Sequence, residues 1–140
     1  MTVRKNLYAV ILLIFATACI VSCEKDNSIK NENGQVIIQG KITLKIRVMH
    51  HQLLVPNLPV YLKKNATSWP GTDSTKYELK TMTDIDGYCQ FDHLFPGNYY
   101  LYAHGYDVNV GKDVIGYHAI ELNSTTAPDN LLNFTLSVSE

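Results

Sequence analysis

The sequence is poor in cysteine and tryptophan and is close to electrical neutrality. It has three cysteines and one tryptophan in 140 residues, and Cys89 is the only cysteine beyond position 23. A mature chain that keeps only Cys89 and a lipidated cysteine can form no intrachain disulfide. The formal net charge is −1, and no basic patch indicates a nucleic-acid partner. No segment has a helical period over ten residues, which argues against helical fold classes.

A long apolar run occurs at the N-terminus, where Arg4 and Lys5 precede "LYAVILLIFATACIV". The run is too short for a transmembrane helix, which needs about 20 apolar residues. Its charged start, apolar middle and small-residue end are typical of a secretory signal, predicted over residues 1–22. The end, "IVSC", resembles the lipobox of bacterial lipoproteins, in which the chain is cut before the cysteine. That resemblance implies that Cys23 carries the lipid, with acyl chains such as palmitate.

Cleavage after Ala18 is the alternative, because "ATAC" also suits ordinary signal peptidase and would release the protein from the membrane. We favour Cys23, since a polar tract follows it directly. Residues 23–35 are predicted to form the lipidated end and a solvated tether. The acidic start "CEKD" is similar to export signals of some lipoproteins of diderm bacteria. We therefore expect a lipid anchor in the outer membrane, with the protein on the cell surface or, alternatively, facing the periplasm.

From Val36 onward the dominant hydrophobic period is two, which predicts strands. In "GKITLKIRV" the residues Ile42, Leu44, Ile46 and Val48 face one way and alternate with polar residues. Similar patterns recur in "PNLPVYLKK", "KYELKTMT", "YHAIELN" and "LNFTLSVSE". Six or seven short strands separated by turns predict an all-β domain over residues 36–140, an antiparallel sandwich.

The segment 83–106 is rich in polar and aromatic side chains, but its spacing predicts turns and strands. Asp84, Asp86 and Gly87 form one predicted turn, with positive φ at the glycine. Pro96 and Gly97 form a second, which fits a type II turn. We expect Cys89 to point inward as a small apolar side chain. No catalytic residue is predicted.

Several of these motifs together resemble the carboxypeptidase regulatory-like domain. They are "GKITLKI", "VPNLPVYL" and "TMTDIDGYCQFDHLFPGNYYLYA", and they cover about residues 39–103. The resemblance implies a prealbumin-like (transthyretin-like), seven-stranded Greek-key sandwich that is usually an accessory module rather than a catalyst. The motifs of the fold's enzymatic relatives, such as the Tyr-Arg-Gly-Ser end of hydroxyisourate hydrolases, are absent from this sequence.

The sequence gives weak grounds for a metal or other cofactor, and we predict none. "DIDGYC" begins like a calcium loop, but Tyr88 and Cys89 stand where a third oxygen ligand and the loop glycine belong. The adjacent His50 and His51 would point to opposite faces of an extended strand. The remaining histidines, His93, His104 and His118, lack the short spacings of zinc sites.

The outward positions of the "YYLYAH" strand are the candidate ligand-binding residues. Tyr100, Tyr102 and His104 would lie about 7 Å apart, as a platform for sugars or a protein, with Tyr88 on a neighbouring strand. The alternative is that these rings merely pack across strands. Trp69 lies in the longest loop and is either a loop anchor or a ligand contact. Ser74, in "DST", resembles an O-glycosylation acceptor.

These observations predict a non-catalytic, lipid-anchored module of the cell envelope with a binding or structural role, which could include glycan recognition. The alternative is a structural subunit or partner protein of an outer-membrane complex. A small metal-dependent enzyme is the third and weakest hypothesis.

Overall fold

A computed structural model describes residues 28–140 except positions 31, 33, 35 and 39. The predicted signal peptide, Cys23 and the first part of the tether lie outside the described residues. β1 (Ser28–Lys30), in the predicted tether, pairs antiparallel with β2 (Val36–Ile38), at the start of the predicted domain. Among the described residues, no helix is long and apolar enough to cross a membrane.

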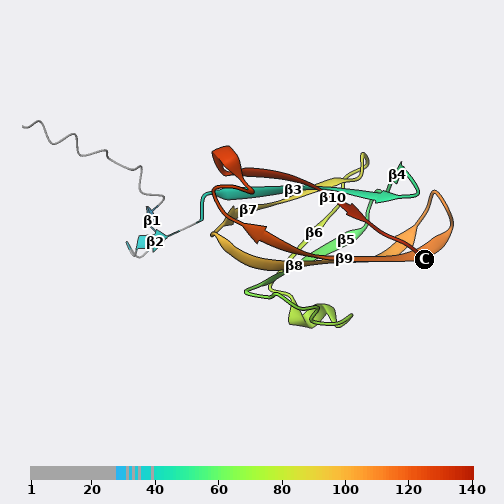
Figure 1. Ribbon diagram of the computed structural model, residues 1–140, viewed down its shortest axis with the longest axis horizontal. Coiled ribbons are helices and arrows are strands. Elements are labelled where there is room, and N and C mark those ends of the chain that lie inside the picture. The colour runs from blue at the N-terminus through green and yellow to red at the C-terminus, as the bar shows by residue number, and fades with distance from the viewer. Residues whose placement is uncertain (1–27, 31, 33, 35, 39) are drawn as a thin grey trace, which may run out of the picture.

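The remaining strands form two facing sheets (Figure 1). The first sheet contains β3 (Ile42–His50), β4 (Leu53–Leu54), β7 (Tyr88–Leu94) and β10 (Leu131–Ser137). The second has the order β6-β5-β8-β9, made of β6 (Leu79–Met82), β5 (Pro59–Lys64), β8 (Gly97–Asp107) and β9 (Lys112–Leu122). Two short 3-10 turns, η1 (Ser74–Lys76) and η2 (Pro128–Asn130), lie outside the sheets. The all-β sandwich is therefore confirmed, with seven strands of four residues or more in the two sheets and the two-residue β4 as an addition.

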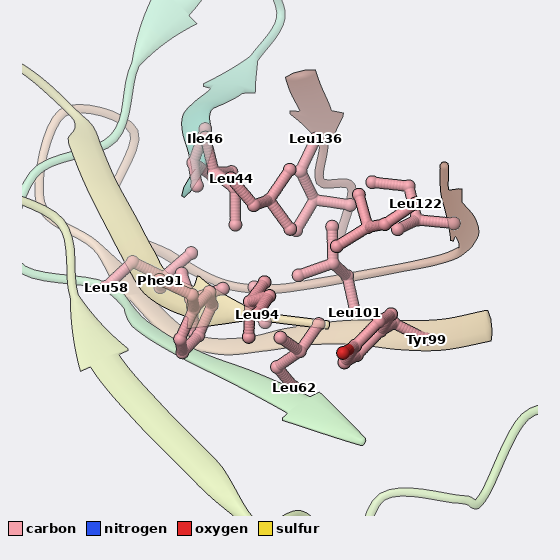
Figure 2. Packing of buried hydrophobic residues seen from close by; sticks show 14 of the residues in the cluster. Leu44, Ile46, Leu58, Leu62, Phe91, Leu94, Tyr99, Leu101, Leu122 and Leu136 are labelled. Carbon is pink, nitrogen blue, oxygen red and sulfur yellow. The ribbon is translucent and has the colours of Figure 1, made fainter. Parts of the chain in front are cut away.

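The alternating apolar residues form the core between the sheets (Figure 2). Leu44, Ile46 and Val48 of β3 are fully buried, as the period of two predicts. Leu62 of β5 and Leu101 of β8 face them from the second sheet. Burial of about 25 cal/mol per Å² of apolar surface makes this core the main source of stability.

One pair of neighbouring strands differs from the antiparallel expectation. β10 runs parallel to β3 over seven residue pairs, from Leu131 beside Thr43 to Ser137 beside Met49. The chain then crosses to the second sheet, where Ser139 pairs with Ile115 of β9. A β-carbon on Gly116 would lie 2.6 Å from the carbonyl oxygen of Ser137. The glycine therefore permits this close approach, by which the chain closes one side of the sandwich.

The turn at residues 84–87 has the predicted conformation. The Asp84 carboxylate accepts hydrogen bonds from the amides of Asp86 (2.9 Å) and Tyr88 (2.8 Å). Gly87 has a φ of 73°, in the region that glycine adopts at little cost.

The turn at Pro96 and Gly97 differs from the type II expectation. Gly97 has a φ of 153° and already belongs to β8, whereas a type II turn needs about +80°. The carbonyl of Phe95 accepts the Tyr99 hydroxyl at 2.8 Å instead. This bond from a tyrosine at a sandwich corner to the preceding backbone replaces the turn's own hydrogen bond.

Candidate functional site

Aromatic residues gather on the outer face of the second sheet. Tyr61, Tyr102 and Tyr117 are neighbours across β5, β8 and β9 in the strand register. The rings of Tyr61 and Tyr102 stack with centroids 5.7 Å apart. These three tyrosines form one cross-strand row on this face of the sheet.

The loop of residues 65–78, between β5 and β6, lies against this outer face (Figure 1). Tyr77 stacks on Tyr102 with centroids 5.3 Å apart, and Trp69 stacks on Tyr117 at 4.5 Å. The Tyr77 hydroxyl also donates a hydrogen bond to the carbonyl of Gly71, at 2.8 Å. We call these five rings (Tyr61, Trp69, Tyr77, Tyr102 and Tyr117) the aromatic cover, because two of them come from the loop that covers the sheet.

The expectation that Tyr102 is an exposed platform residue is wrong. Only 1% of its surface is exposed, because Tyr61, Tyr77 and His104 surround its ring. Burial, and secondly the neighbouring Tyr61, raise the pKa of Tyr102. Tyr100 is half-buried and His104 is exposed on the same face. For Tyr102 the alternative of cross-strand packing is therefore the one that the structure supports.

Tyr88 does not join this cluster. It lies on β7, beside Arg47 of β3, and therefore in the other sheet. The expectation of a neighbouring strand is wrong because β7 pairs with β3 and not with β8. Tyr88 is 44% exposed.

The Trp69–Tyr117 pair is the part of the aromatic cover that solvent reaches. The two rings are nearly parallel, at 12°, and are 43% and 48% exposed. A flat, half-exposed aromatic pair can stack against an apolar ring face of a ligand. Trp69 is thus both an anchor of the loop and a surface residue.

Apolar side chains also gather at one end of the sandwich, at the β3–β4 hairpin. There the turn containing Ile85 packs against Leu54, since a β-carbon on Gly87 would lie 2.9 Å from that of Leu54. The Asn109 side chain donates a hydrogen bond to the Leu54 carbonyl at 3.0 Å, which brings the β8–β9 turn to the same end. We call this group the apolar end; its exposed members are Leu53, Leu54, Ile85, Val108 and Val110.

The apolar end lies opposite the point at which the chain enters the sandwich. β3 begins at Ile42, two residues after Gly40, and runs the length of the sheet to His50 (Figure 1). Ile85 is 77% exposed and Val108 64%. Exposed apolar side chains that gather at one end of a domain are candidates for an interaction surface.

A buried polar pair lies beneath the same end. His50 and Asp107 are both fully buried, and the histidine Nδ1 is 2.9 Å from the Asp107 carboxylate. The second oxygen of Asp107 accepts the amide of Asn109 at 2.9 Å. A buried charge must be paired or hydrogen-bonded to be tolerated, and this pair was not predicted from the sequence.

The other candidate residues occupy separate places. Ser74 is exposed at the start of η1, and the Asp73 side chain accepts the next amide, of Thr75, at 3.0 Å. Cys89 is half-buried against the core, and burial raises its pKa to about 12. Its thiol is therefore protonated at neutral pH and a poor nucleophile.

Sequence patterns missed Tyr61, Tyr77 and Tyr117 as members of the aromatic cover. Tyr61 and Tyr117 stand at outward positions of their strands, as Tyr102 does, so the shared strand parity was a usable signal. Tyr77 lies on a loop whose path no local pattern specifies. The pairing of His50 with Asp107 joins residues 57 positions apart and had no local signal.

Comparison with known proteins supports the fold and no closer relationship. No protein-family model matches the chain, and no curated protein matches its sequence. A variant of BcpA, the major pilin subunit of Bacillus cereus, superposes with a TM-score of 0.50 at 10% identity, over 81% of this chain and 36% of that chain. The structure titled BcpA itself gives a TM-score of 0.49 at 11% identity, over 80% of this chain and 36% of that chain. The chain thus spans about a third of the pilin subunit that it resembles.

Proposed function

We propose that this protein is a non-catalytic, lipid-anchored module of the bacterial cell envelope that contacts another envelope protein through its apolar end. The observation that carries this proposal is the position of that end, opposite the entry of the chain into the sandwich (Figure 1). A tether attached through Cys23 would leave this end pointing away from the membrane. The likeness of the fold to a pilin subunit supports a structural role. In this proposal the anchor lies in the outer membrane of a diderm bacterium.

A photoreactive benzoyl-phenylalanine in place of Ile85 tests the contact in living cells. We expect one discrete cross-linked product, because Ile85, at 77%, is the most exposed large apolar side chain in the part of the chain that the structure describes. The matched control carries the same group at Asn98, which is exposed at the opposite end, at the start of β8. Leu53→Asp in the Ile85-labelled chain should reduce the product. Equal products from both positions, or none from position 85, would refute the proposal.

Glycan recognition is the second candidate, and the exposed Trp69–Tyr117 stack favours it. A sugar ring stacks on an aromatic side chain only if one face of that side chain is accessible. Trp69 and Tyr117 offer such a face, whereas Tyr102 does not. On a glycan array, the full chain in detergent should bind and Trp69→Ala should abolish binding. Tyr102→Phe, which keeps the buried ring, should bind normally. An array without signal, or equal binding by Trp69→Ala, would remove this candidate.

A further inference from the structure

The hairpin that joins β3 to β4 brings two adjacent histidines together. His51 and Gln52 have φ values of 46° and 72°, the left-handed pair that a two-residue type I′ turn requires. Asn and Gly are the usual residues in such a turn, whereas this chain has His51 and Gln52 there. Because the chain turns at this point, the two imidazole rings lie side by side, with centroids 4.3 Å apart. The expectation that they point apart holds only for an extended chain.

The buried His50 ring has an unpaired nitrogen near the ring of His51. The Nδ1 atom of His50 lies 2.9 Å from a carboxylate oxygen of Asp107. In the tautomer that donates this hydrogen bond, Nε2 has a free lone pair. Nε2 is buried and has no hydrogen-bond partner among the described residues. Buried polar atoms nearly always have a partner, from the protein, water or an ion, so this nitrogen is available to bind one.

A carboxylate completes the group. Oε1 of Glu140 lies 3.9 Å from Nε2 of His50 and 3.8 Å from Nε2 of His51. All three ligand atoms lie within 4.8 Å of one another. These separations are too long for hydrogen bonds. The separations of 3.9 and 3.8 Å are about 0.6 and 0.5 Å longer than the roughly 3.3 Å between ligands on a tetrahedral ion with bonds of about 2.0 Å.

We propose that His50, His51 and Glu140 form a binding site for a divalent first-row transition metal ion, with Zn²⁺ as its foremost occupant. Two imidazoles and one carboxylate are a donor set that zinc takes, with water in the fourth position. Asp107 serves as the outer partner that orients His50, as carboxylates commonly do for metal-bound histidines. His51 and Glu140 are 71% and 48% exposed, so their side chains can close on the ion.

The ion would link three separate segments at the apolar end: the β3–β4 hairpin, the segment after β10 and, through Asp107, the end of β8. A positive charge also faces the group, since Lys112 Nζ of β9 lies 3.9 Å from Oε2 of Glu140. The lysine competes with the ion for that carboxylate. Removal of its charge, as in Lys112→Gln, should tighten metal binding.

The test is Zn²⁺ binding by the full chain in detergent, in competition with a chromophoric chelator. We expect one ion per chain, and X-ray absorption should give nitrogen or oxygen ligands at about 2.0 Å with imidazole scattering. His51→Gly removes a ligand while relieving the positive φ, and it should weaken binding at least tenfold. Glu140→Gln should weaken it by a similar factor.

Gln52→Gly is the matched control, because it relieves the second positive φ of the same turn and keeps all three ligands. It should bind Zn²⁺ as the natural chain does. The proposal is overturned if the natural chain binds no Zn²⁺, or if His51→Gly and Glu140→Gln bind as tightly as Gln52→Gly.

Discussion

Tyr102→Ala should destabilise the domain by about 3–5 kcal/mol, the usual cost of truncating a buried aromatic side chain. The Tyr102 ring is 1% exposed and lies between the sheet and the loop of residues 65–78. Its removal leaves a cavity and takes away the surface on which Tyr77 stacks. A thermal melt should show a fall of more than about 10 °C for a domain of this size.

The loop should respond before the sandwich unfolds. Lys76 is exposed in η1, and its ammonium donates to the Pro70 carbonyl at 3.3 Å. In Tyr102→Ala we expect faster trypsin cleavage after Lys76. Tyr102→Phe is the control, since it keeps the stacked ring. Its free energy of unfolding should lie within about 1 kcal/mol of that of the natural chain. If Tyr102→Ala were as stable as Tyr102→Phe, the aromatic cover would have no part in stability.

Gly87→Val should destabilise the domain by about 2–5 kcal/mol, from a strained backbone and a steric clash together. The φ of 73° is unfavourable for any residue with a β-carbon and most of all for a β-branched one. The added β-carbon would also lie 3.0 Å from the amide nitrogen of Val55. In addition, the Gly87 carbonyl accepts the Val48 amide at 3.0 Å, which ties this turn to β3.

A substitution at Gly111 distinguishes backbone strain from steric clash as the cause of the loss. Its φ of 75° matches that of Gly87, but a β-carbon there meets its nearest atom, the Tyr106 hydroxyl, at 3.4 Å. Gly111→Ala should therefore cost only the backbone strain, about 1 kcal/mol. Gly87→Ala should cost clearly more in chemical denaturation. Equal losses for the two alanine variants would mean that the turn at residues 84–87 can move away from Leu54.

The sequence predicted structure best where a residue's environment depends on the residues next to it in the chain. The alternation in residues 42–48 predicted the buried side of β3, and Asp84 with Gly87 predicted a turn with positive φ. The same reasoning failed for Tyr102, because strand parity tells which face a residue occupies but not what covers that face. The cover comes from a loop whose position depends on contacts with Tyr102 and Tyr117.

The prediction that His50 and His51 point apart was wrong for a related reason. Their separation onto opposite faces follows only if the backbone stays extended, and His51 and Gln52 are not residues that normally signal a type I′ turn. The partners Asp107 and Glu140 come from segments more than 50 residues away. Only the three-dimensional fold places them against His50.

The parallel pairing of β10 with β3 has a mechanical consequence. A load applied at the apolar end and resisted at the entry to β3 would pull along the strands. The hydrogen bonds between β3 and β10, which span seven residue pairs, run across the strands, so such a load would shear them together rather than open them one at a time. β7 adds a second ladder on the other side of β3. The force needed to unfold the domain should therefore be higher when the load acts along β3 than when it pulls the edge strand β6 away from β5. The ladder between β6 and β5 has four residue pairs.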